Sequence, residues 1–323
     1  MKNKIVFIVC AFITVLVLQG CAVTQKKTDT QKKYEDAANL NAEESTVTDH
    51  SDPIRIGVTL YSIQNEYTKR FANAAQSQAE QMGIELQLYD GNYDASRQNS
   101  QVEEMIRDEL DGILMIPQDS EICVEGAETA LKAGIPVVSV NTRVNSNEII
   151  SYVGSNDIEA GELVAKSIAE VLNGTGNIVI LEGPIGQSAQ TERLEGIKNV
   201  LVEYPDVHVI GNKTANWSRL EAKNIMQKWL QTFDRIDAVI AENDDMALGA
   251  LEAIEDANQE IYVVGIDGSE EGLQAVEDGR MYMTVFQDAE EQSKKALEVI
   301  VKYIKGEAVE ENYWIPLEEI TAE

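Results

Sequence analysis

The stretch DAVIAENDDMALGAL at residues 237–251, followed by VVGIDG at 263–268, holds the pattern that decides the fold of this chain. The apolar run 237–241 predicts a buried strand, 247–257 predicts a helix, and 261–266 predicts a second apolar strand. Apolar strands that alternate with helices are typical of parallel sheets, because the crossover helices cover both faces of such a sheet. The stretch therefore indicates an α/β fold.

The same alternation of strands and helices extends in both directions from this stretch. In the first half the strand starts lie 29, 28 and 23 residues apart, and in the second half they lie 30, 30 and 24 apart. The matched spacing predicts two similar doubly wound, Rossmann-like domains, each with a parallel sheet buried by helices. The other predicted strands are 54–60, 84–89, 111–117, 135–140, 177–181, 207–211 and 282–286, and the other predicted helices are 66–82, 95–109, 192–204, 218–232 and one that ends at Gly134.

Polar and aromatic side chains gather where the predicted strands end. Ligands of open α/β sheets bind outside the carboxyl ends of the strands, so two facing edges would hold a ligand between the domains. The candidate ligand-binding residues at these ends are Tyr61, Asn65, Tyr67, Asn141, Thr142, Arg143, Thr191, Arg193, Trp217, Asn243, Asp267 and Gln287.

These side chains match the chemistry of a polyhydroxylated ligand. Each sugar hydroxyl donates one hydrogen bond and accepts others, and Asn, Gln, Asp and Arg supply the matching acceptors and donors. The axial C–H faces of a sugar are apolar and pack on flat Tyr or Trp rings. Hydrogen bonds to charged groups contribute about 1.5–3 kcal/mol each, so a handful could reach the ~8 kcal/mol of micromolar affinity.

Some of these residues also have an ordinary structural interpretation. Asn243 and Asp267 directly follow apolar strands, so we favour ligand contact over turn capping, which is the usual role of Asn and Asp. Asp244 and Asp245 are instead interpreted as caps of the helix that begins near Met246.

The larger side chains leave alternatives open. Trp217 lies in a polar stretch with little core to join, which favours stacking on a ligand. For Tyr61 the sequence does not decide between a position in the cleft and a position in the core. For Tyr67 it favours the cleft. For Arg143 the sequence does not decide between ligand contact and a surface ion pair. Arg193 is interpreted as a structural or hinge-forming residue.

The motif Asn-Asp-Asp-Met-Ala-Leu-Gly at 243–249, followed by a strand and Gly-Ile-Asp-Gly at 265–268, resembles a known family. It is similar to the ribose/galactose-type sugar-binding proteins of bacterial ABC importers, which are type I periplasmic binding proteins. The resemblance runs from about Ile54 to the end of the chain. It implies two doubly wound domains that are joined by a three-strand hinge and close on a monosaccharide.

The resemblance also implies roles for particular residues and a division of the chain. Asn65, Trp217, Asn243, Asp267 and Gln287 would hydrogen-bond or stack on the sugar, with Tyr67 as the opposing ring. The chain would cross between domains near Ser155, Asp288 and Pro316. The expected domains are 54–155 with 288–316, and 156–287 with 317–323.

Three positions depart from the ribose-binding pattern. Asn141-Thr142 stands where an Asp-Arg pair is usual, and Arg143 comes one place later. Thr191 stands at the place of a sugar-binding arginine, while Arg193 matches a more general arginine of the family. Tyr61 stands where a small residue is common. These departures put ribose itself in doubt as the ligand, and no calcium loop is recognisable.

The N-terminus predicts an extracytoplasmic, lipid-anchored protein. Lys2 and Lys4 precede the apolar run 5–18, which is short for a membrane span and ends in Leu-Gln-Gly-Cys21. This pattern is typical of a lipoprotein signal peptide, residues 1–20, with lipid on Cys21. The alternative is an uncleaved N-terminal anchor. Residues 21–52 lack a core pattern and are predicted to be a flexible tether.

Composition argues against several classes of protein. The formal net charge of −30 disfavours nucleic acid as a partner. Only Cys123 remains after the signal peptide and the lipid site, so no intrachain disulfide is expected, and this thiol is predicted to be buried. His50 and His208 lie far apart without neighbouring cysteines, so no metal site is expected.

No catalytic motif is present, and we expect neither an enzyme nor a cofactor. The chain lacks a GxSxG elbow, a phosphate-binding loop ending in Gly-Lys-Ser/Thr, and a GxGxxG fingerprint. The expected function is therefore capture of a monosaccharide or related polyol and delivery to a membrane ABC permease, by a monomer held to the lipid bilayer through Cys21. The alternatives are a binding protein that presents its sugar to a receptor or histidine kinase, and an extracytoplasmic enzyme acting on a sugar.

Overall fold

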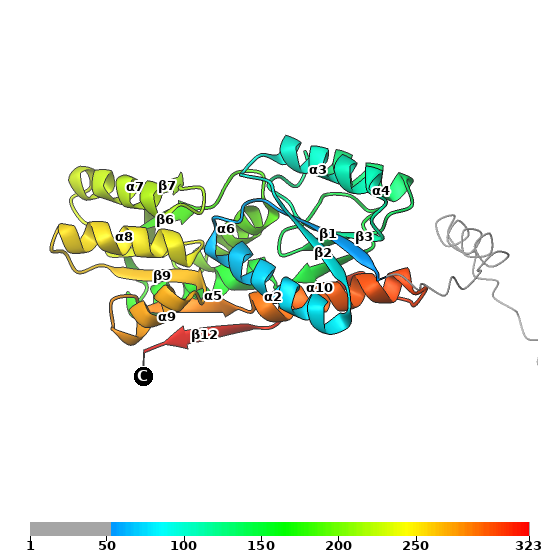
Figure 1. Ribbon diagram of the computed structural model, residues 1–323. Coiled ribbons are helices and arrows are strands. Elements are labelled where there is room, and N and C mark those ends of the chain that lie inside the picture. Colours follow the sequence, from blue (N-terminus) through cyan, green and yellow to red (C-terminus); the bar gives the residue numbers. More distant parts are fainter. Residues whose placement is uncertain (1–52, 323) are drawn as a thin grey trace, which may run out of the picture. The chain divides into compact units, whose positions relative to one another are not determined.

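Two six-stranded sheets organise residues 53–322, the part of the chain that the computed structural model describes (Figure 1). The predicted signal peptide, the lipid site at Cys21 and the predicted tether lie outside the described residues. Within residues 53–322, no helix combines the length and the apolar character that a membrane span requires.

The first sheet has the strand order β11-β5-β4-β3-β1-β2, and all its neighbouring strands are parallel. Its strands are β1 (Arg55–Leu60), β2 (Glu85–Asp90), β3 (Gly112–Ile116), β4 (Val137–Val140), β5 (Ser151–Gly154) and β11 (Asn312–Trp314). With its helices it forms what we call the first lobe; these are α2 (Glu66–Met82), α3 (Ala95–Arg107), α4 (Val124–Lys132) and α10 (Ala289–Ile304).

The second sheet has the order β12-β10-β9-β8-β6-β7, and only its edge strand β12 runs antiparallel to its neighbour. Its strands are β6 (Thr175–Glu182), β7 (Asp206–Thr214), β8 (Ala238–Ala241), β9 (Tyr262–Asp267), β10 (Met283–Gln287) and β12 (Leu317–Thr321). The second lobe is completed by α5 (Asp157–Val171), α6 (Ser188–Leu201), α7 (Arg219–Thr232), α8 (Asp244–Asp256) and α9 (Glu270–Glu277).

The chain crosses between the lobes three times. β5 leads into α5, β10 leads into α10, and β11 leads into β12. α10 packs on α2 and β3 of the first lobe, although the strand before it belongs to the second sheet. The strands at the crossings are neighbours at one end of each sheet, β5 and β11 in the first and β10 and β12 in the second, so the three connections lie close together.

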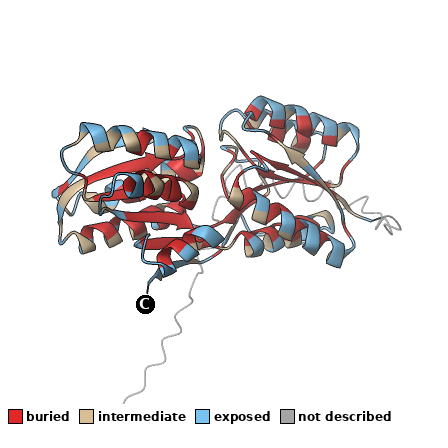
Figure 2. Cartoon of the chain, turned by 60° about the vertical axis from the view of Figure 1, so that its left-hand side comes forward, coloured by how far each residue is buried: buried red, intermediate tan, exposed pale blue. Residues whose placement is uncertain are grey.

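Burial follows from the helical covering of both sheets (Figure 2). β3 and β8 are buried along their whole length, whereas the edge strands β2 and β7 keep exposed positions. Apolar side chains from strands and helices form the continuous buried clusters that hold each lobe together. Burial on both faces explains why the central strands read as uninterrupted apolar runs in the sequence.

The fold class predicted from the sequence is confirmed, with differences at the ends of elements. β5, β11, β12, α5 and α9 were not among the predicted elements, and α6 begins at Ser188 rather than at residue 192. Cys123 is buried, as predicted, and burial raises the pKa of its thiol to about 11. Helix starts are marked by side chains that accept a hydrogen bond from the first turn, such as Asn65 for α2 and Asn243 for α8.

Candidate ligand-binding site

One narrow cavity, which we call the interlobe cavity, lies between the carboxyl ends of the two sheets. Its free volume is about 10 Å³, room for about one water molecule and far below the usual range of about 300–1,000 Å³ for ligand pockets. A solute the size of a sugar therefore enters only when the two lobes move apart. Its lining residues are Tyr61, Asn65, Tyr67, Asn141, Thr142, Gln187, Ala189, Arg193, Trp217, Asn243, Asp267 and Gln287.

The structure brings ten of the twelve predicted site residues to this cavity. Arg143 and Thr191 do not line it, and the sequence reasoning missed Gln187 and Ala189. Every lining residue is buried, so polar groups in the cavity are held in place by the fold rather than by solvent. Contact of these residues with a ligand stays a prediction.

Arg193 is the fixed cation of the cavity. Its Nε donates to Asp157 Oδ1 at 2.8 Å, and its Nη1 donates to the backbone oxygen of Glu242. Burial lowers the pKa of Arg193, but the neighbouring Asp157 and Asp267 carboxylates outweigh that effect and raise it. The guanidinium is thus a paired, permanently charged group, as the structural interpretation of Arg193 expected, and it also faces the cavity.

Trp217 provides the flat apolar wall of the cavity. Its ring lies against Gly183, where a Cβ atom would come within 2.1 Å of the indole, so only glycine fits there. The Arg193 guanidinium lies 5.5 Å from the ring centroid. Only 6% of Trp217 is exposed, and it belongs to a buried apolar cluster. The expectation that this residue has little core to join was therefore wrong.

A chain of hydrogen bonds joins the two lobes across the cavity. Gln287 Nε2 donates to Asp267 Oδ1 at 2.6 Å, and Asn141 Nδ2 donates to Gln287 Oε1 at 3.1 Å. Asp267 and Asn141 both have positive φ angles, 128° and 60°, which cost non-glycine residues about 1–3 kcal/mol. Such strain at the ends of β9 and β4 is typical of functional positions.

Asn65 and Tyr67 are two residues of the first lobe that line the cavity. The Asn65 oxygen accepts from Thr68 N at 3.3 Å, so its amide NH₂ remains for a ligand. The Tyr67 hydroxyl donates to Gln292 Oε1 on α10, which holds the phenol in place. Tyr67 therefore offers its ring rather than its hydroxyl, in agreement with a stacking role.

The contacts at the carboxyl end of β8 show that the predicted cap of α8 was wrong. The cap of α8 is Asn243, whose oxygen accepts from Met246 N at 3.0 Å, and not Asp244 or Asp245. Asp244 is fully buried and accepts from Ser269 N and Thr284 Oγ1, each at 2.7 Å. It ties α8 to the strands on either side of α9, and this long-range role was invisible in the local sequence.

Arg143 lies beside the hinge instead of in the cavity. Its guanidinium stacks 3.7 Å from the Tyr152 ring centroid and 5.1 Å from that of Trp314, and its Nη1 donates to Asn312 Oδ1 at 3.0 Å. Its Nε lies 3.6 Å from Glu192 Oε1 on the second lobe. Arg143 thus links β5, β11 and α6, and of the two interpretations left open for it the structure favours the ion pair.

Thr191 also turns away from the cavity. It is exposed, and its hydroxyl donates to the backbone oxygen of Gln187 at 3.3 Å, one helical turn earlier. The cavity is instead reached from the start of α6, where Gln187 and Ala189 stand. Because the predicted helix began at residue 192, these positions were taken for loop and were not considered.

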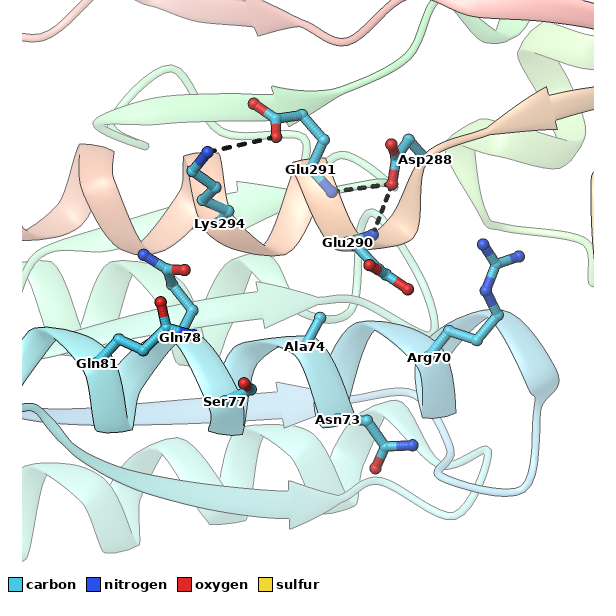
Figure 3. Close-up of a pocket in the computed structure, with 10 residues that line it drawn as sticks. All are labelled: Arg70, Asn73, Ala74, Ser77, Gln78, Gln81, Asp288, Glu290, Glu291 and Lys294. Carbon is cyan, nitrogen blue, oxygen red and sulfur yellow. Dashed lines mark hydrogen bonds and ion pairs between the residues drawn. The ribbon is translucent and has the colours of Figure 1, made fainter.

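A second hollow lies outside the cavity, between α2 and α10 of the first lobe (Figure 3). In this hollow Asp288 caps α10 by accepting from the backbone N–H groups of Glu290 and Glu291, and Lys294 lies 3.8 Å from Glu291. It has no aromatic wall among its lining residues. Within residues 53–322, no group of three His, Cys, Asp or Glu side chains is arranged to hold a metal ion.

Buried carboxyl groups make stability depend on pH. Burial raises the pKa of Glu192 from 4.5 to about 7 and that of Asp245 to about 6, and it also raises the pKa of Asp157. For a carboxyl whose pKa is raised by folding, the contribution to stability is complete below its unfolded pKa and is lost as pH rises through the folded pKa.

The protein is therefore expected to melt at a lower temperature at pH 8 than at pH 5. Glu192 is only partly buried and is screened by solvent, so it alone accounts for a loss on the order of 1–2 kcal/mol between pH 4.5 and 7. Thermal melts at constant ionic strength measure the loss, and Glu192→Gln should reduce it, while Glu203→Gln, at an exposed position just after α6, should not. Equal pH dependence in Glu192→Gln and wild type would contradict this assignment.

Comparison with known proteins adds independent information. A family model described as a periplasmic binding protein domain matches residues 56–308. A xylitol-binding protein of Mycolicibacterium smegmatis is 38% identical over 262 residues, which cover 80% of this chain and 75% of that protein. The ribose import binding protein RbsB of Bacillus subtilis is 31% identical over 262 residues, which cover 81% of this chain and 85% of that protein.

Solved structures agree with these matches. An ABC transporter solute binding protein from Bacillus halodurans C-125, with bound myo-inositol, superposes with a TM-score of 0.81 and 34% sequence identity. The match covers 85% of this chain and 96% of that one. These relatives are binding proteins rather than enzymes.

Proposed function

The chain belongs to the family of periplasmic binding proteins, and from that premise we propose that it captures a neutral polyhydroxylated solute and delivers it to an ABC importer. The solute is a monosaccharide or a related polyol, held in the interlobe cavity. The observation that carries the proposal is the cavity lining: a tryptophan wall beside buried amide, carboxylate and guanidinium groups from both lobes. These groups match the donors, acceptors and apolar faces of a polyol.

The charge balance of the cavity favours a neutral solute over an anionic one. Arg193 is already paired with Asp157, and Asp267 accepts a hydrogen bond from Gln287. An anionic ligand would bring an additional buried negative charge without a free cation among the lining residues, which is costly in a desolvated site. Xylitol, ribose and myo-inositol, the solutes named for the relatives, are all neutral polyols.

Closure of the two lobes over the solute is the proposed mechanism. Besides the Asn141–Gln287 bond, Ser120 N donates to Gly186 O at 2.9 Å, and Arg70 Nη1 donates to Gly268 O at 3.1 Å, both across the lobes. A solute that touches both lobes adds contacts only when these edges meet, so it shifts the population towards the closed form. The permease would then recognise that form.

The same proposal places the protein outside the cytoplasmic membrane, anchored through lipid on Cys21. We propose that two bodies move relative to each other on closure. They are residues 54–155 with 288–316, and residues 156–287 with 317–323. The mass of the mature N-terminal peptide tests the anchor, because an unmodified Cys21 would exclude it.

The test of function is a titration followed by an uptake assay. Purified protein is titrated with myo-inositol, xylitol, D-ribose and further pentoses and hexoses, while tryptophan fluorescence is followed. We expect saturation at micromolar concentration by one of them, the cargo, with no cargo consumed. Deleting the gene should abolish cellular uptake of the cargo at low concentration. Consumption would instead indicate an enzyme, and unchanged uptake would indicate the sensory alternative.

A further inference from the structure

Gln187 stands at a position in the cavity that the sequence did not reveal. It is the residue before the first turn of α6, it is 1% exposed, and it lines the interlobe cavity. The preceding Gly186 has a φ of 103°, and a Cβ there would meet Asp119 of the first lobe at 2.3 Å. The loop is thus held closely against the opposite lobe, and Gln187 has little freedom to move.

The orientation of the Gln187 amide is fixed by its neighbour. Trp217 Nε1 lies 2.7 Å from Gln187 Oε1, and an indole N–H can only donate a hydrogen bond. The amide atom that faces the indole must therefore be the oxygen. The other end, the Nε2 amide with its two N–H groups, is consequently turned away from Trp217.

This Nε2 group has no hydrogen-bond partner among the described residues, although it is buried. Buried donors are almost always satisfied in folded proteins, and an unsatisfied one calls for a reason. Gln287 and Asn141, two other buried amides of the cavity, donate to Asp267 and to Gln287 respectively. Gln187 is therefore the amide of the cavity whose NH₂ group is fully buried and has no partner among the described residues.

We infer that Gln187 is a specificity-determining residue, whose Nε2 donates to an oxygen of the bound polyol while Trp217 keeps its amide from flipping. The inference rests on the proposed function and deepens it. Because the fixed amide can only donate, the cavity selects solutes with an accepting oxygen, hydroxyl or ring ether, at this position. A deoxy analogue that lacks the oxygen would leave the donor buried and unpaired.

The alternative is that Gln187 only holds Trp217 in place. The two roles separate in a cycle of variants, because Trp217→Phe keeps a ring but removes the N–H that Gln187 accepts from. If Gln187 acted only through Trp217, Gln187→Met would cost nothing further in the Trp217→Phe background. If Gln187 donates to the cargo, Gln187→Met weakens binding in both backgrounds.

Gln190 offers a matched control on the same helix. It is also buried, but its Nε2 donates to Glu182 Oε2 at 2.9 Å, and it does not line the cavity. Gln190→Met removes the same amide from a neighbouring buried position. It should change stability without changing which polyols bind.

The experiment measures dissociation constants by calorimetry for wild type, Gln187→Met, Gln190→Met, Trp217→Phe and the Gln187→Met/Trp217→Phe double variant. The probes are myo-inositol, xylitol and D-ribose, and then the monodeoxy analogues of the one that binds most tightly. Gln187→Met is expected to raise the dissociation constant about 10- to 100-fold in both backgrounds, and Gln190→Met less than about threefold. One deoxy analogue should bind wild type about tenfold more weakly than its parent, and this difference should vanish in Gln187→Met.

Each other outcome has a distinct meaning. Gln187→Met with unchanged affinity, or an effect that disappears in the Trp217→Phe background, would overturn the role of Gln187 and leave the proposed function standing. Equal discrimination among the deoxy analogues by wild type and Gln187→Met would overturn it as well. Wild-type protein that no polyol saturates would overturn the proposed function and this inference together.

Discussion

Replacing Asp267 with alanine is expected to weaken cargo binding at least about a hundredfold, or about 2.7 kcal/mol. The Asp267 carboxyl is held at the end of β9 by a backbone with a φ of 128°, is 6% exposed and lines the cavity. Hydroxyl groups that donate to a carboxylate form stronger bonds than neutral pairs do. Its loss also removes the acceptor of Gln287, and so disturbs the bonds that join the lobes.

Calorimetric titration with the cargo measures this effect. Asp267→Asn should be milder, near tenfold, because its oxygen can still accept from Gln287. Asp278→Ala, at an exposed carboxyl that follows α9, is the matched control and should bind like wild type. Trp217→Ala is also expected to abolish binding, but it removes a buried ring from the core and will lower stability too. Wild-type affinity in both alanine variants would exclude the interlobe cavity as the binding site.

Replacing Arg193 with methionine is expected to lower the free energy of unfolding by about 3–5 kcal/mol. Asp157, at the start of α5, is 2% exposed and receives the Arg193 Nε bond at 2.8 Å. Without the guanidinium, that carboxylate must stay buried without a counter-charge or take up a proton. The backbone oxygen of Glu242 at the end of β8 also loses its donor.

Urea unfolding followed by circular dichroism measures the loss. Arg219→Met is the matched control, because Arg219 pairs with Glu252 and Glu271 at the surface, where ion pairs contribute about 0–1 kcal/mol. Adding Asp157→Asn to Arg193→Met should recover part of the stability, since it removes the stranded charge. If Arg193→Met cost no more than Arg219→Met, the buried pair would not be a structural anchor.

The periodic pattern of the sequence was enough to predict the fold and most of the site. Uninterrupted apolar strands such as β3 and β8 are the direct result of burial on both faces, and the side chains after them must lie at the same edge of a sheet. Asn243 and Asp267 were found by that rule alone. The predicted family resemblance is confirmed by the matched family model.

The misses arise where long-range contacts decide a residue's role. Asn141 turns the chain with a φ of 60°, so Arg143, two residues on, is directed to Tyr152 and the hinge instead of the cavity. Asp244 finds its partner Thr284 forty residues away. Gln187 was hidden because the first turn of α6 has no apolar periodicity of its own. Local sequence therefore located the site better than it assigned individual contacts.

The most direct test of the account is a crystal structure of the protein with its cargo. We predict that the cargo lies in the interlobe cavity, flat against Trp217, with its oxygens within hydrogen-bonding distance of Asp267 and Asn65. Side chains of both lobes should contact it at once, as closure requires. Cargo bound in the hollow between α2 and α10, or held by one lobe alone, would contradict the account.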